Sequence, residues 1–393
     1  MNNNNFSIMR YFRDLGVDAY LVLTKEDGNG CLSHFIPEND TTQFDKWSPF
    51  IINTGVDLRI ASICRSVQLK KIVSEFDICI GSGLTLSAFA KLGRSLEIFY
   101  PYGVGIEFIG EQNVRDGYPK VNFIKRWFRL HMRKKMIIGL KQTHLCICPE
   151  STLTQQTFKE LNIPFEGLGI PMVYNNESSL GSINLNKEVR VLIDQYVKRD
   201  CILFFCHMRH DQEVKIHDIY LEGFAKFLMR SNSKKAILFL VKYGKDIDET
   251  KNKIVQLGIS DNVVWLPVMS RREIIYILDK YVTFGFNNFE GRMWGGTGWE
   301  FLASGVPFFH YFNTTEEEFQ MNFRSPLPPF FNTRSSEEIC EKLIYLTHNK
   351  DELNAISIEM KKWFEKFGGI GLAKIWMELI IDVYRKNKIE SYK

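Results

Sequence analysis

The sequence predicts an α/β protein of two domains, each with a parallel sheet covered by helices on both faces. Three observations predict this class. The chain has 393 residues, which is more than the ~150 residues typical of one domain. Short apolar runs alternate with stretches of helical spacing along most of the chain, as strands and helices do in parallel α/β sheets. An Asn-, Ser- and Gly-rich stretch at 174–186 interrupts that alternation and is the best candidate linker.

The individual elements follow from the same patterns. In the first half, strands are expected at 19–24, 77–80, 96–100 and 144–148, and helices at 6–15, 56–76 and 84–93. In the second half, strands are expected at 201–206, 236–241, 262–266, 281–286 and 306–311, with helices at 217–230, 245–257, 271–279, 299–304 and over the tail, 335–390. The chain opens on a helix, whereas a doubly wound domain normally opens on a strand, so that strand is either absent or precedes the sequence.

These elements divide the chain into three parts. We expect a first domain over 1–180, a second over 187–370, and a closing helix over 371–393 that is a candidate to cross back to the first domain.

Composition excludes several classes of protein. Apolar residues make up 45% of the chain and charged residues 24%, which excludes a disordered chain, a collagen-like fibre and a coiled coil. The net charge of +4 is too small for a general nucleic-acid binder. Eight cysteines, most of them in apolar runs and none in a CxxC pair, predict free thiols in a reducing compartment. No signal peptide and no ~18-residue apolar span is found, so we expect a cytoplasmic protein.

The segment 281–311 (YVTFGFNNFEGRMWGGTGWEFLASGVPFFHY) carries the most chemical information. A buried strand leads into a loop with Glu290, and a Gly-rich turn then precedes a helix that contains Glu300. The turn consists of Gly295, Gly296, Thr297 and Gly298. Glycines let a ligand approach the backbone, free amides at a helix start suit phosphate oxygens, and a carboxylate can accept both hydroxyls of a ribose. The alternative interpretation is a tight turn with solvent-facing glutamates.

A second segment, 201–228, places two cations after a strand. Arg209 follows the strand and Lys215 lies six residues later, with His210 between them. Arg binds two oxygens of a diphosphate in a fork and Lys adds a point charge. Two surface cations on a loop are the alternative.

Together these segments resemble the donor-binding half of the GT-B glycosyltransferases, especially the retaining family 4 enzymes. The resemblance covers roughly 190–380 and rests on the Arg–Lys spacing, on WEFLASGVPFF and on the closing helices. It implies two Rossmann-like domains facing a cleft. The family usually has seven residues between its two glutamates, whereas nine (291–299) separate them here, so the family's first glutamate position falls nearer Arg292 than Glu290.

The resemblance also implies roles for these residues. Arg209 and Lys215 would hold the donor diphosphate, with His210 near it, and Glu290 would contact the transferred sugar. Glu300 would bind the ribose, and the 295–298 turn would supply backbone donors. The implied reaction is sugar transfer from a nucleotide-diphosphate sugar to a glycan or lipid-linked acceptor in surface-polysaccharide synthesis, with retention and with neither metal nor cofactor. In such a reaction the leaving phosphate itself accepts the acceptor's proton. An inverting enzyme would need a base, for which His34, Asp27 and Glu107 are conceivable.

Positive charge is concentrated in one stretch. Residues 117–149 contain no Asp or Glu, although the whole chain carries only +4. The stretch holds eight cations: Lys120, Lys125, Arg126, Arg129, Arg133, Lys134, Lys135 and Lys141. The candidate membrane or acceptor surface consists of Lys125, Arg126, Trp127, Arg129, Arg133 and Lys134. A basic helix with aromatic residues can lie on an anionic membrane surface, which predicts a peripheral contact through 120–141. A packed helix with a solvated basic face is the alternative.

Three other patterns resemble metal or dinucleotide sites, and two other functions are possible on this fold. Asp246 and Asp248 begin a helix, where acidic residues are explained by the helix dipole rather than by a metal. His207, His210 and Asp211 match no strong metal-ligand spacing. The turn 81–83 lacks the third glycine of a dinucleotide motif. A nucleotide-sugar epimerase on the same fold would carry a different turn from GGTGWE, and a non-catalytic, transferase-like partner subunit would fit the absent strand and the wide glutamate spacing.

Overall fold

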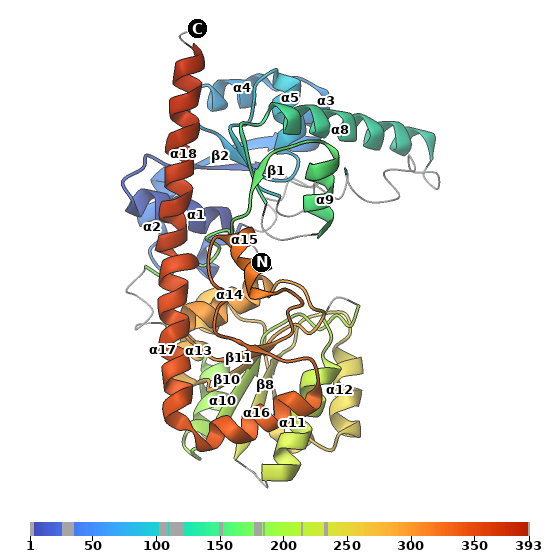
Figure 1. Ribbon diagram of the computed structural model, residues 1–393, viewed down its shortest axis with the longest axis vertical. Helices are drawn as coiled ribbons and strands as arrows, with labels where there is room; N and C mark the ends of the chain where they lie inside the picture. Colours follow the sequence, from blue (N-terminus) through green and yellow to red (C-terminus); the bar gives the residue numbers. More distant parts are fainter. Residues whose placement is uncertain are drawn as a thin grey trace.

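The computed structural model is described here for residues 4–25, 35–101, 109, 122–148, 152–176, 183, 185–213, 215–231 and 235–391. Figure 1 shows an elongated molecule in which the N-terminal half (residues up to 176) lies above the C-terminal half (residues from 185). The long helix α18 (Ile370–Ser391) runs along the side of the molecule and reaches the N-terminal half.

The C-terminal half is built on a parallel sheet with the order β12-β11-β10-β7-β8-β9 among the described residues. Its strands are β7 (Ile202–Cys206), β8 (Ala236–Val241), β9 (Val263–Leu266), β10 (Phe284–Phe286), β11 (Phe308–His310) and β12 (Phe331–Asn332). From β7 the chain adds strands outward to β9, then returns to the other side of β7 with β10. The direction of strand order therefore reverses between β7 and β10.

Helices cover both faces of this sheet. They are α10 (Lys187–Val197), α11 (Asp218–Ser231), α12 (Ile247–Gln256), α13 (Arg271–Tyr281), α14 (Gly295–Ser304), α15 (Glu316–Phe323), α16 (Ser336–His348) and α17 (Lys350–Phe367), with a short 3-10 turn η4 (Ser260–Asn262). Successive residues of β7 point to opposite faces: Phe205 packs in the core beneath α10, α13 and α14, and Phe204 in the core beneath α11 and α16. Each fully buried side chain of this kind stabilises the fold by about 1.5–3 kcal/mol.

The predicted α/β class is therefore confirmed. The five strands expected in the second half are all present, because strands buried on both faces read as continuous apolar runs. The short strand β12 and the helices α10 and α15 were not predicted.

The N-terminal half contains two parallel sheets among the described residues. The first pairs β1 (Leu21–Lys25) with β2 (Ile51–Asp57), and the second has the order β3 (Ile80–Gly81), β4 (Ile98–Phe99), β5 (Leu145–Ile147) and β6 (Phe165–Glu166). The surrounding helices are α1 (Asn4–Asp14), α2 (Phe44–Trp47), α3 (Leu58–Ile63), α4 (Val67–Val73), α5 (Thr85–Leu92), α8 (Phe123–Gln142) and α9 (Thr152–Glu160), with 3-10 turns η1 (Pro37–Asn39) and η2 (Ser48–Phe50).

The helix expected over 56–76 is wrong at its start and in its continuity. Strand β2 runs to Asp57, whose carboxylate then accepts hydrogen bonds from the amides of Arg59 (2.8 Å) and Ile60 (3.3 Å) and begins α3. A second cap, the Ser66 hydroxyl, accepts from the Leu69 amide at 3.1 Å and begins α4. Two N-caps make two short helices where the apolar spacing alone predicts one.

Helix α18 packs against the first helix of the chain. Its residues Leu372 and Trp376 share a buried core with Phe6 and Tyr11 of α1, and the Trp376 indole donates to the Gly169 carbonyl at 2.9 Å. Within the described residues, no helix is both long and apolar enough to span a membrane.

Candidate functional site

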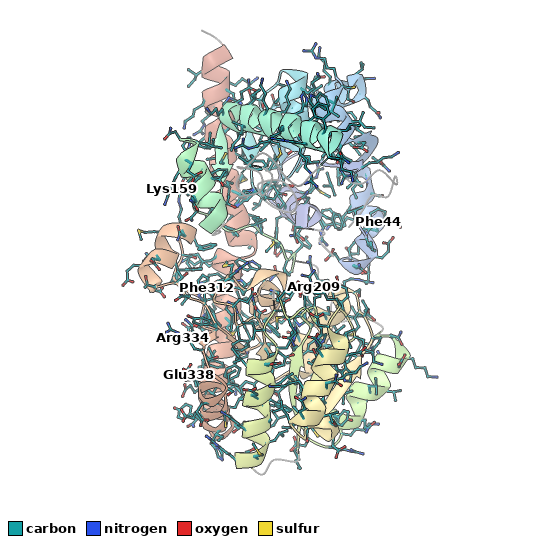
Figure 2. The ribbon with its side chains drawn as sticks, turned by 90° about the vertical axis from the view of Figure 1, so that its right-hand side faces the viewer. Phe44, Lys159, Arg209, Phe312, Arg334 and Glu338 are labelled. Atoms are coloured by element: carbon teal, nitrogen blue, oxygen red, sulfur yellow. The ribbon has the colours of Figure 1, made fainter. Side chains whose placement is uncertain are left out.

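The strand order of the C-terminal half predicts where a ligand binds. In open parallel sheets, ligands bind beyond the carboxyl ends of the strands at the point where the order reverses. Here that point lies between β7 and β10. The segments that follow these two strands hold Arg209 and Lys215 after β7, and Glu290 and the Gly-rich turn after β10. Figure 2 places Arg209 at the end of the C-terminal half that faces the N-terminal half.

At the start of α14, the backbone amides are not covered or capped by side chains. The first turn of a helix leaves its amide hydrogens without intrahelical acceptors, and the N-cap residue, Trp294, supplies no side-chain hydrogen bond. A Cβ built on Gly295 or Gly296 would meet nothing within 4 Å, whereas one on Gly298 would lie 2.4 Å from the Trp294 Cβ. Gly295 also needs its left-handed φ of +63°. The first two glycines therefore leave open space beside free amides, and Gly298 is required for packing.

Arg209, Lys215 and Glu290 lie within electrostatic reach of one another. Burial lowers the pKa of Lys215, the carboxylate of Glu290 raises it, and the charges of Arg209 and Arg292 lower it further. Arg209 is half-exposed and pairs with Asp211 at 3.0 Å. The predicted diphosphate clamp thus consists of one partly buried cation and one exposed cation.

Glu290 is held loosely. Its carboxylate accepts from the Asn288 amide at 3.5 Å and lies 3.9 Å from Nε of Arg292, and its side chain is 13% exposed. The extra residues between the two glutamates include Gly291, with a φ of +79°. The carboxylate keeps capacity for further hydrogen bonds.

Glu300, by contrast, is buried and held on both sides. Its Oε2 lies 2.8 Å from Nε2 of His207, at the end of β7, and its Oε1 accepts from Nε of Arg271 at 2.8 Å. Burial raises the pKa of Glu300, but the hydrogen bond from His207 and the charge of Arg271 outweigh that effect and lower its pKa below the ordinary value. Glu300 is therefore an ionised carboxylate at neutral pH.

His210 lies in the interior beside the predicted site. Its ring is fully buried, with Nδ1 3.0 Å from the Thr250 hydroxyl and Nε2 3.1 Å from the Val241 carbonyl. It stacks on His217 at 4.6 Å, and burial lowers the pKa of His210 to about 4 and that of His217 to about 3. Both ring nitrogens of His210 thus have hydrogen-bond partners within the protein.

Several residues of this region were not predicted or were passed over. Arg271 carries the bond to Glu300, and its only sequence signal is two adjacent arginines at a helix start, where the dipole disfavours positive charge. His207 was set aside as a metal ligand and instead contacts Glu300. The bases considered for inversion (His34, Asp27 and Glu107) lie outside the described residues.

Asp246 and Asp248, the acidic pair at the start of α12, are bonded to other residues of the protein. Asp246 accepts from the Gln212 amide at 2.8 Å, and Asp248 pairs with Lys251 at 2.8 Å. The described residues contain no group of three or more His, Cys, Asp or Glu arranged to hold a metal ion.

The basic stretch forms helix α8, which Figure 1 shows extending away from the body of the molecule. Its second half packs through Met136 and Leu140 into the core that includes α5, and Met132 is also buried. Its first half exposes Phe123 (81%), Ile124 (78%) and Trp127 (54%). Lys125, Arg126 and Lys134 are exposed, and Arg129 and Arg133 are partly buried.

Glycosyltransferases are among the solved structures with a similar architecture. The sequence matches no protein-family model and no curated protein. HepE of Anabaena, solved with UDP, is 10% identical over 92% of this chain and 100% of that chain, with a TM-score of 0.57. A glycosyltransferase from Rickettsia africae is 13% identical over 98% of this chain and 93% of that chain, with a TM-score of 0.58. WaaG, a glycosyltransferase of lipopolysaccharide biosynthesis, is 13% identical over 96% of this chain and 95% of that chain, with a TM-score of 0.51. The chain therefore has the fold of the GT-B glycosyltransferases.

Proposed function

We propose that the protein is a glycosyltransferase that uses a nucleoside-diphosphate sugar as donor. The observation that carries this proposal is the strand order: Arg209 and Lys215 follow β7, and the uncapped, glycine-lined start of α14 follows the neighbouring β10, where the order reverses. Cations and free amides together form a site for a diphosphate. Glu300, ionised and buried next to this site, would accept the ribose hydroxyls. UDP and UDP-glucose are bound in structures of HepE, which shares the fold.

The chemistry follows from these charges. The bond between C1 of the sugar and the diphosphate breaks, a bond from C1 to the acceptor oxygen forms, and the acceptor's proton passes to the leaving phosphate. Negative charge grows on the diphosphate as it leaves, and preorganised donors stabilise such charge most effectively. Arg209, Lys215 and the α14 amides would supply that stabilisation without a metal or a cofactor. Glu290, with free acceptor capacity, would contact the sugar, and transfer with retention needs no side-chain base.

The acceptor side of the proposal rests on α8. Exposed aromatic and aliphatic side chains interleaved with cations match an anionic lipid surface. We propose that the protein binds peripherally to a membrane through Phe123, Ile124, Trp127, Lys125 and Arg126, on its cytoplasmic side, and acts on a lipid-linked or glycan acceptor for a surface polysaccharide. Its N-terminal half would present the acceptor to the donor held by the C-terminal half.

The donor site is tested by calorimetric titration with UDP, GDP, ADP, CMP and NAD in the presence of EDTA. We expect one nucleoside diphosphate to bind, and Arg209→Ala, Lys215→Met and Glu300→Ala each to weaken it by at least about tenfold, as expected for lost hydrogen bonds between charged groups. Lys251→Met, on the exposed face of α12, is the matched control. If none of these nucleotides binds, the donor site is wrong and a non-catalytic, transferase-like subunit becomes the better description.

A further inference from the structure

Arg271 joins the two halves of the molecule at Glu300. Its Nε donates to Glu300 at 2.8 Å, and its Nη1 lies 3.3 Å from both Oδ1 of Asp40 and the carbonyl of Met172. Glu300 belongs to α14 of the C-terminal half. Asp40 follows η1 of the N-terminal half, and Met172 lies in the segment that follows β6. One guanidinium thus contacts three separate parts of the chain.

These contacts are buried. The exposed fractions of the side chains are 11% for Arg271, 9% for Glu300 and 4% for Asp40. Charges removed from water interact more strongly than surface charges, and losing one partner of such a set is costly. The set Asp40–Arg271–Glu300 therefore has one favoured arrangement in which all three groups are satisfied.

The guanidinium is a rigid planar fork. Its Nε side holds Glu300 while its Nη1 side holds the N-terminal half, so both contacts persist only at the present separation of the two halves. When the N-terminal half moves away, Arg271 must leave either Asp40 or Glu300. The neighbouring Arg272 also reaches the N-terminal half, with its Nε donating to the Glu38 carbonyl at 2.8 Å, but no recorded contact joins it to Glu300.

We propose that Arg271 is a positioning residue that couples the seating of the N-terminal half to the orientation of the Glu300 carboxylate. The inference rests on the proposed function, in which Glu300 accepts the ribose hydroxyls. Two of the carboxylate's acceptor positions are taken by His207 and Arg271, and the remaining ones face the ribose in the correct direction only while both partners hold it. Asp40, which pairs with Arg271 rather than with Glu300, thereby influences recognition of the ribose.

The test compares two ligands, UDP and 2′,3′-dideoxy-UDP, by calorimetry on the full chain. If GDP or ADP binds more tightly, that nucleotide and its dideoxy analogue are used. The ratio of the two dissociation constants reports recognition of the ribose hydroxyls alone. We expect a ratio of about tenfold or more in the wild-type protein. Arg271→Lys, which keeps the charge but lacks the fork, and Asp40→Ala should both bring the ratio towards one.

Arg272→Lys is the matched control and should keep the wild-type ratio. If Asp40 has a purely structural role, Asp40→Ala weakens the binding of both ligands equally. An unchanged ratio of the two dissociation constants in Asp40→Ala therefore overturns the inference. Asp40→Asn offers a second variant if Asp40→Ala does not fold, and it should lower the ratio less because its amide oxygen can still accept. A wild-type ratio near one removes the ribose role of Glu300 and the inference with it, but leaves the diphosphate site. Absence of binding to the wild-type protein overturns the proposed function itself.

Discussion

Nε2 of His207 lies 2.8 Å from Oε2 of Glu300, and this contact joins the end of β7 to helix α14. The two residues are 93 positions apart in the sequence. They meet because β7 and β10 are neighbours in the sheet and α14 follows β10. The contact therefore fixes the Glu300 carboxylate at the point where the strand order reverses.

Removing the charge of Glu300 should destabilise the protein. Glu300→Gln leaves Arg271 with one carboxylate fewer in a buried position, and breaking a buried pair in this way costs about 3–5 kcal/mol. Urea denaturation of both proteins at pH 7 measures the difference in the free energy of unfolding. Glu290→Gln, whose contacts are 3.5 Å and 3.9 Å long, should change it by less than about 1 kcal/mol. Equal effects of the two substitutions would show that the contacts of Glu300 are not special.

Acid should destabilise the protein through its buried histidines. Burial lowers the pKa of His310 to about 3, as it lowers those of His210 and His217. Above about pH 6.5 each histidine is neutral in both states, and below it the unfolded state takes up protons that the native state does not. The free energy of unfolding therefore falls as the pH drops from 6.5, by about 2 kcal/mol per histidine at pH 5.

The share of one histidine can be isolated. Burial lowers the pKa of His310 although backbone hydrogen bonds to Asn288 and Arg292 raise it, and its ring lies 5.3 Å from that of Phe330 and 6.1 Å from that of Phe312. In His310→Phe, the loss of stability between pH 7.5 and pH 5 should be smaller by about 2 kcal/mol, measured by urea denaturation at both values. The same loss in both proteins would mean that His310 does not resist protonation.

Substitutions at two glycines of the same turn, Gly296 and Gly298, distinguish a role in binding from a role in packing. Gly296→Ala should leave the free energy of unfolding unchanged or raise it by up to about 1 kcal/mol, because its Cβ meets nothing and Ala favours helix. It should nevertheless weaken nucleoside-diphosphate binding by at least about tenfold, because the methyl group occupies the space beside the free amides. Gly298→Ala should lower stability by about 1–3 kcal/mol through overlap with Trp294. If a folded Gly296→Ala protein binds the nucleoside diphosphate as tightly as the wild-type protein, the phosphate does not bind at the start of α14.

Membrane binding is expected to depend on α8. Replacing Lys125 and Arg126 together by Gln should reduce partitioning onto phosphatidylserine-containing vesicles by about 30-fold, since each cation contributes about 1 kcal/mol. Co-sedimentation measures the bound fraction. The control replaces Lys187 and Lys198, which are exposed on and beside α10, and it should bind like the wild-type protein. Equal recovery with neutral and anionic vesicles would remove the membrane proposal.

The sequence predicts the parts of this fold that depend on local pattern. Strands β7 and β8 are continuous apolar runs and are located correctly, whereas β2 (IINTGVD) mixes polar and glycine residues and is missed. The Gly-rich turn and Glu300 are visible in sequence because one short segment carries them. The bridge from Arg271 to Asp40 joins residues 231 positions apart and has no local pattern. The direction of the His210 ring is likewise set by Thr250 and Val241 on other elements.

Hydrogen–deuterium exchange tests the central claim most directly. The wild-type protein would be compared with and without the nucleoside diphosphate that binds it. In the proposed donor site, a diphosphate at the reversal of strand order would accept hydrogen bonds from the backbone amides of Gly295, Gly296 and Thr297, so their exchange should slow, together with that of the loop after β7. Protection confined to the N-terminal half, with unchanged exchange at the start of α14, would contradict the account.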